Sequence, residues 1–142
     1  ATLLQSGSAP FSLTASSLIY KLSQVSASTV EEALKRGLRF SQADTLRCHL
    51  TVETTLGPVG SAALAASECG DEEQQAAFGR CAVLLLENGS DDPQALICQN
   101  GIPGDFDALT APGSYVSGGL SASWLEPVRE CLAKMKVRGP AA

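Results

Sequence analysis

A strict alternation of side chains between Thr45 and Glu53 limits most strongly how this chain can fold. Its apolar positions are Leu46, Cys48, Leu50 and Val52, and every residue between them is polar. A period of two is typical of a strand that buries one side and exposes the other. We therefore expect a strand with one covered side at this point of the chain.

Apolar residues at helical spacing lie on both sides of this strand. Recurrence at three and four residues gives a helix one buried stripe, and capping boxes mark where a helix begins. The pattern predicts helices that begin at Ser16 and at the capping box Thr29–Glu32, and two more over Ser61–Ala66 and Asp71–Phe78. A last helix is expected to begin at Ser123 and to end at Gly139-Pro140. One face of this last helix carries the apolar residues Trp124, Val128, Cys131, Leu132 and Met135.

Three shorter segments have the length and composition of strands, namely Thr2–Gln5, Cys81–Glu87 and Gln94–Gln99. The polar loop 88–93 is expected to join the last two as a hairpin, residues 57–60 to form a turn, and residues 101–120 to be irregular. The resulting order is β-α-α-β-α-β-β, a long loop and a final helix. It predicts one α+β domain over residues 1–136, with helices packed on one face of a small, mainly antiparallel sheet, and a C-terminal tail over residues 137–142.

Composition excludes two classes of partner. The net charge is −5 and no cluster of Lys or Arg is present, whereas a nucleic-acid surface needs a basic stripe. The longest apolar run, Ala82–Leu86, is too short to span a bilayer. We expect no binding to nucleic acid, no membrane insertion and a monomer.

The five cysteines lie too far apart in sequence for a structural zinc site, and no cofactor motif is present, so we expect neither metal nor cofactor. In a reducing compartment the thiols would be small core residues; in a secreted protein four would pair and one would be left over. The secreted alternative is favoured by a start at Ala1, with no signal peptide in the chain as given, and by the glycosylation sequon Asn88-Gly89-Ser90. It predicts the pairs Cys48–Cys98 and Cys69–Cys81, with Cys131 left unpaired.

Candidate catalytic groups are few. His49 is the only histidine and lies on the polar side of the alternating strand, where its neighbours Arg47 and Thr51 do not suggest a triad. We therefore expect a solvated strand histidine and no catalytic residues. Exposed carboxylates are the remaining polar candidates, and they could cap helix N-termini on a partner protein. They are Asp91 and Asp92 at the predicted hairpin tip, and Asp105 and Asp107 in the long loop.

Short motifs between Ala33 and Gly101 resemble those of parvulin-type prolyl isomerases. Residues 34–40, Leu-Lys-Arg-Gly-Leu-Arg-Phe, are similar to that family's helix end, residues 57–60 to its glycine turn, and Ala76-Ala77-Phe78 to a helix motif. The predicted element order is similar as well. Parvulins use paired histidines from their first and last strands, and neither Thr2–Gln5 nor Gln94–Gln99 contains one. The resemblance therefore implies a parvulin-like frame without isomerase chemistry.

A secreted parvulin-like chain with cysteines and few histidines resembles the parvulin-like microneme proteins of apicomplexan parasites. That resemblance implies a non-catalytic protein, secreted or held in a secretory organelle, that inhibits a subtilisin-type serine protease by imitating its prodomain. Subtilisin prodomains place helices on one side of an antiparallel sheet and a C-terminal tail in the active-site cleft. The corresponding tail here begins Val137, Arg138, Gly139. Two alternatives stay open: a divergent prolyl isomerase that relies on His49, and a plain adhesion or scaffolding domain.

Overall fold

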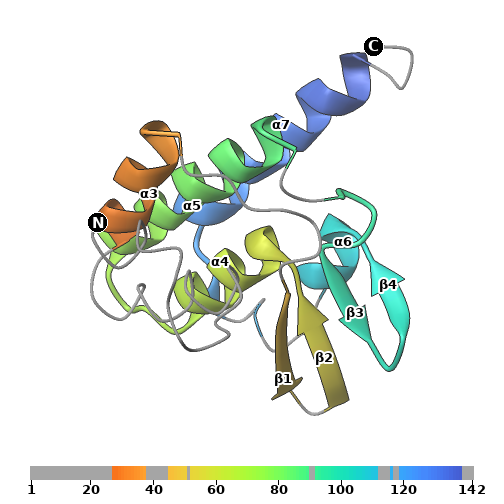
Figure 1. Ribbon diagram of the computed structural model, residues 1–142. Coiled ribbons are helices and arrows are strands. Elements are labelled where there is room, and N and C mark those ends of the chain that lie inside the picture. The colour runs from red at the N-terminus through yellow and green to blue at the C-terminus, as the bar shows by residue number, and fades with distance from the viewer. Residues whose placement is uncertain are drawn as a thin grey trace.

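The computed structural model describes residues 27–37, 45–50, 52–89, 92–111, 116 and 119–138 (Figure 1). The predicted strand Thr2–Gln5 and the predicted helix from Ser16 lie outside these residues. The helices are α3 (Ala27–Lys35), α4 (Pro58–Ser67), α5 (Glu72–Glu87), α6 (Phe106–Leu109) and α7 (Ala122–Arg138), and the strands are β1 (Leu46–Leu50), β2 (Val52–Leu56), β3 (Ile97–Gln99) and β4 (Ile102–Gly104).

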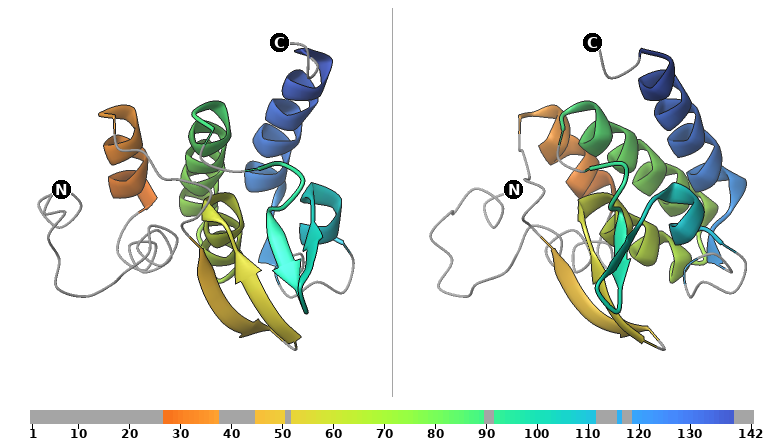
Figure 2. Two further views of the ribbon diagram at one scale, coloured as in Figure 1. Left: turned by 45° about the vertical axis from the view of Figure 1, so that its right-hand side comes forward. Right: turned by 90° about the vertical axis from the view of Figure 1, so that its right-hand side faces the viewer.

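The four strands form one antiparallel sheet in the order β1-β2-β3-β4, and the helices pack against it. The predicted fold class, a single α+β domain, is therefore confirmed. Helix α5 contacts α3, α4 and α7, while α4 also reaches β2 (Figures 1 and 2). The helical layer thus carries most of the core, and the β1–β2 hairpin extends away from it (Figure 2).

Alternation along the strands gives the sheet two unlike faces. The register places Thr54 and Leu56 of β2 on one face, both with no exposed surface, together with Ile97 of β3. The opposite face carries Arg47 opposite Thr55, and Thr55 opposite Cys98. Arg47 is exposed, and Thr55 and Cys98 are partly exposed. The sequence prediction of a strand with one covered side is correct here.

Helix α4 is buried along nearly its whole length, which its small side chains permit. All residues from Pro58 to Ala66 are buried between α5 and the sheet. Pro58 lies at the first helical position, where its missing N–H costs no hydrogen bond. Gly60 faces the carbonyl oxygen of Leu96, and a Cβ there would come within 2.5 Å of it. The segment 57–60 is therefore the start of a helix and not the predicted turn.

The predicted strand Cys81–Glu87 is wrong. These residues are the second half of α5, which starts at the N-cap Asp71, whose side chain accepts a hydrogen bond from the N–H of Glu73. An unbroken apolar run has no period, so a buried strand and a helix with neighbours on several sides look alike in sequence. Here α3, α4 and α7 surround α5, and that explains the run.

The two hairpins of the sheet also differ from prediction. The alternating segment is not one strand, since β1 ends at Leu50 and β2 begins at Val52, the residue that pairs with it. The second hairpin joins β3 to β4 through Asn100 and Gly101, which both have positive φ, 52° and 81°. Asn-Gly is the residue pair that favours this two-residue turn. Residues 101–120, predicted as irregular, therefore contain β4 and α6.

Helix boundaries differ at the predicted capping boxes. Helix α3 begins at Ala27, whose N–H bonds to the side chain of Gln74, so Thr29 lies within the helix. Ser123 likewise lies within α7 and donates its hydroxyl to Glu72. Gly37, at φ 110°, follows the end of α3.

Candidate functional site

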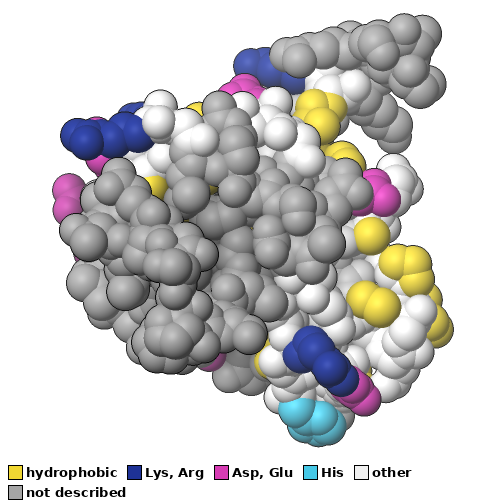
Figure 3. Space-filling view, viewed as in Figure 1, with side chains coloured by type: hydrophobic (Ala, Val, Ile, Leu, Met, Phe, Trp, Pro, Cys, Tyr) yellow, Lys and Arg dark blue, Asp and Glu magenta, His cyan; other side chains and the backbone are white. Residues whose placement is uncertain are grey.

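The exposed side of the sheet is the first candidate surface, and we call it the outer sheet face; its residues are Arg47, His49, Glu53, Thr55 and Cys98. Arg47 and Glu53 form an ion pair of 3.6 Å, with 80% and 73% of their side chains exposed. His49 lies directly across from Glu53. Figure 3 shows the only histidine beside a basic and an acidic side chain at the free end of the sheet.

A shallow depression of about 670 Å³ lies at this end of the sheet. Its lining comes from both faces of the β1–β2 hairpin, namely Arg47, His49 and Glu53 of the outer sheet face, Cys48 and Val52 of the opposite face, and Asn100. Asn100 is fixed there because its N–H bonds to the carbonyl oxygen of Glu53 at 3.0 Å. The depression is wide and open, so it fits a protein surface better than a small molecule, whose sites are enclosed.

Neither Cys48 nor Cys98 is placed to act as a nucleophile beside His49. Cys48, its chain neighbour, points to the opposite face. Cys98 shares the outer sheet face but lies on β3, with β2 between. Two strand spacings are about 9–10 Å, whereas a base must lie about 3 Å from the group it deprotonates. Thr51 lies outside the described residues. The outer sheet face is therefore a charged surface whose side chains can form hydrogen bonds with a partner.

The predicted acidic residues do not form one cluster with a shared role. Asp105 is the N-cap of α6 and accepts a hydrogen bond from the N–H of Ala108. Asp92 accepts one from the N–H of Gln94 in a turn, and Asp107 is exposed in the first turn of α6. Asp91 lies outside the described residues. Two of the four carboxylates therefore already serve local backbone structure.

The structure forms no disulfide among the five cysteines, and the predicted pairs stay a prediction. Cys48 and Cys98 lie on opposite faces of the sheet and on strands separated by β2. Cys69 precedes α5, while Cys81 lies nine residues inside it, about 14 Å along the axis from the first residue of that helix. A disulfide needs its Cα atoms within about 7 Å.

The predicted tail begins inside a helix, since α7 continues through Val137 to Arg138. Only Gly139 to Ala142 follow, and they lie outside the described residues. Asn88 of the sequon is the C-cap of α5, and its side-chain amide donates to the carbonyl oxygen of Leu84 at 2.7 Å.

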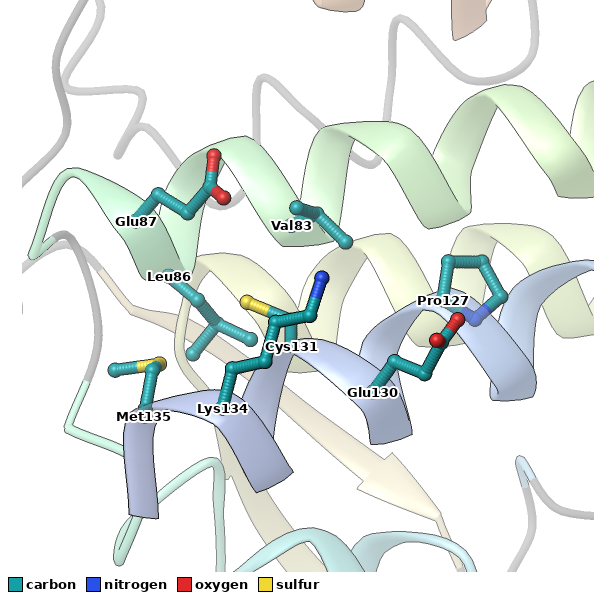
Figure 4. A pocket seen from close by; sticks show the side chains of 8 residues that line it. All are labelled: Val83, Leu86, Glu87, Pro127, Glu130, Cys131, Lys134 and Met135. Carbon is teal, nitrogen blue, oxygen red and sulfur yellow. The ribbon is translucent and has the colours of Figure 1, made fainter. Parts of the chain in front are cut away.

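A groove between α5 and α7 is the second candidate surface, and sequence analysis did not predict it (Figure 4). It encloses about 280 Å³. Its apolar lining comes from Val83 and Leu86 of α5 and from Pro127, Cys131 and Met135 of α7. The predicted apolar stripe of the last helix is correct, but the structure buries only Trp124, Val128 and Cys131 and leaves Leu132 and Met135 partly exposed.

Three charged side chains rim this groove. In Figure 4 the carboxylates of Glu87 and Glu130 lie toward its two ends, and the ammonium of Lys134 lies between them. The described part of the chain contains no group of three side chains able to hold a metal ion. None of its helices is long and apolar enough to cross a membrane. No family model, curated protein or solved structure matches this chain.

Proposed function

We propose that this chain is a non-catalytic protein-binding domain that docks on its partner through the outer sheet face. The observation that carries the proposal is the asymmetry of the sheet: its inner face packs under helices, whereas its outer face presents an exposed ion pair and His49. Arginine is enriched among the residues that contribute most to protein interfaces. Arg47 is the residue of this face that we expect to contribute most.

The partner class we propose is a serine protease of the subtilisin type, with the domain secreted or held in a secretory organelle. This part rests on the resemblance of the sequence and on the fold class, since subtilisin prodomains also carry helices on one side of an antiparallel sheet. One feature that favoured the resemblance, the element order, differs in the structure. The fold supports a docking sheet, and the protease is the narrower proposal.

The test is inhibition of peptide hydrolysis. The full chain at micromolar concentration should slow a subtilisin-type protease, and Arg47→Ala should weaken inhibition about tenfold, as removal of a central interface arginine does. Arg36→Ala is the matched control, because Arg36 is also exposed and also paired with a glutamate, but lies after α3. Unchanged hydrolysis rates would reject the protease. Equal effects of Arg47→Ala and Arg36→Ala on inhibition would reject docking through the outer sheet face.

Two further measurements test the role of the C-terminal segment and the alternative function as an isomerase. Truncation after Arg138 keeps α7 intact and removes Gly139 to Ala142. Weaker inhibition by the truncated chain would indicate that this segment binds in the active-site cleft of the protease. A peptidyl-prolyl isomerisation assay tests for an enzyme. Acceleration that disappears in His49→Ala would replace the binding domain with an isomerase.

A further inference from the structure

We propose that the α5–α7 groove binds an amphipathic helix of a partner protein that carries basic residues beside its apolar stripe. This inference is independent of the outer sheet face and of the protease. An apolar helix stripe that enters a groove between two helices is a common mode of peptide recognition. The groove meets three conditions for this occupant: size, shape and charge.

Size argues against a small-molecule ligand. The groove volume of about 280 Å³ lies below the 300–1,000 Å³ typical of sites that enclose a ligand, so it accepts a few side chains and not a whole compound. The lining side chains Leu86, Cys131 and Met135 offer apolar contact to such side chains. Met135 is unbranched and adapts its shape to what it contacts.

The shape favours an elongated occupant. Helices α5 and α7 run side by side in the same direction, as Gly79 meets Ser123 and Trp124 near the start of α7, and Leu86 and Met135 line the groove farther along. Helix α7 then continues past the end of α5 (Figure 1). An elongated occupant that lies along the groove would therefore run parallel to both helices.

Charge at the rim selects a basic occupant. Two of the three rim charges are carboxylates, Glu87 and Glu130. Glu87 also lies in the last turn of α5, which contains no basic residue. The C-terminal end of a helix carries about half a negative charge, and Glu87 adds to it where a cation would normally stabilise the helix. Lys or Arg of the occupant would supply that cation, and the net charge of −5 on the chain also favours a positively charged partner.

The test uses two designed helical peptides of about 14 residues, about 21 Å long. Both carry the same leucine stripe; one has lysine at all other positions and the second has glutamate. Met135 is the only methionine of the chain, so a ¹³C-methyl methionine label gives one NMR signal from the groove. The lysine peptide should shift this signal, and the glutamate peptide at equal concentration should not. The signal of His49, the only histidine, should stay in place.

Charge reversal decides whether the groove or the overall charge is responsible. By fluorescence anisotropy, the double variant Glu87→Lys/Glu130→Lys should bind the lysine peptide about tenfold more weakly, since two attractive contacts become repulsive. The control Glu32→Lys/Glu126→Lys makes the same change of net charge at exposed positions outside the groove and outside the outer sheet face, and it should bind as the unmodified chain does. An unmoved Met135 signal, equal binding of both peptides, or equal losses in the two double variants would each overturn the proposal.

Discussion

Glu31 shows how a single buried charge ties two helices of this molecule together. Only 7% of the residue is exposed, and its carboxylate accepts hydrogen bonds from Arg80 of α5 at 2.7 Å and from Lys35 of its own helix at 3.2 Å. Burial raises the pKa of Glu31, but the two cations outweigh burial and lower the pKa on balance. The carboxylate therefore stays ionised at neutral pH and stabilises the contact between α3 and α5.

Replacing Glu31 by Gln should reduce the free energy of unfolding at pH 7 by about 1–3 kcal/mol, because Arg80 loses its charged partner. Since the pKa in the folded protein is below 4.5, the contribution of the carboxylate is complete above that pH and is lost as the pH falls through the lowered pKa. The difference between Glu31→Gln and the unmodified chain should thus shrink in acid. Urea unfolding from pH 7 to pH 3 measures it.

Glu32→Gln is the control for this series, because Glu32 is exposed and paired with Arg36 on the surface. Its effect should stay within about 0.5 kcal/mol at every pH. A loss that is equal for Glu31 and Glu32, or that does not depend on pH, would contradict the role assigned to Glu31.

Cys81, next to Arg80 in α5, should be chemically inert in the folded protein. Burial raises the pKa of its thiol to about 12, and the nearby carboxylate of Glu31 also raises it. The thiol donates to the carbonyl oxygen of Ala27 at 3.7 Å. Because only the thiolate reacts, iodoacetamide near pH 8 should leave Cys81 unmodified until the protein unfolds. Mass spectrometry of the modified peptides tests this, with the partly exposed Cys98 as the internal comparison.

The same experiment counts thiols. Five reactive cysteines after denaturation without reductant would match the structure, which contains no disulfide, whereas one reactive cysteine would match the predicted pairs of a secreted protein. Rapid labelling of Cys81 in the native protein would contradict its burial, and a count below five would show a disulfide that the structure does not contain.

Among the elements, α4 depends most closely on having small residues where it approaches β2. In an exposed helix, Gly→Ala stabilises by up to about 1 kcal/mol. At Gly60 the new methyl group would meet the carbonyl oxygen of Leu96 and the side chain of Leu56, so Gly60→Ala should destabilise by about 1–3 kcal/mol. Gly70→Ala is the matched control, since nothing lies within 4 Å of that position. Thermal unfolding of both variants measures the difference; a Gly60→Ala protein as stable as Gly70→Ala would contradict this packing.

Sequence patterns predicted some elements and not others, for physical reasons. The N-terminal part of α5 and all of α7 carry a capping residue or an apolar stripe, which are local signals. The prediction of a strand at Cys81–Glu87 is wrong because three other helices bury these residues, and a local sequence pattern does not show such tertiary contacts. The β3–β4 hairpin had a local signal, Asn100-Gly101, that could have been used.

For the molecule as a whole, the alternation from Thr45 to Glu53 correctly indicated a half-covered sheet, and so the outer sheet face could be predicted in part. The α5–α7 groove could not, because it depends on the relative placement of two helices that are far apart in sequence. Cysteine pairing depends on tertiary placement in the same way, since face and strand order decide which cysteines meet.

The central claim is that the outer sheet face docks on a protein, and His49 reports on it directly. As the only histidine, it gives one imidazole signal in a chain labelled with ¹³C-histidine. Titration with a subtilisin-type protease, inactivated by substitution of its catalytic serine, should shift or broaden this signal while the methyl signal of Met135 stays in place. A His49 signal that does not change at saturating protease would contradict the account.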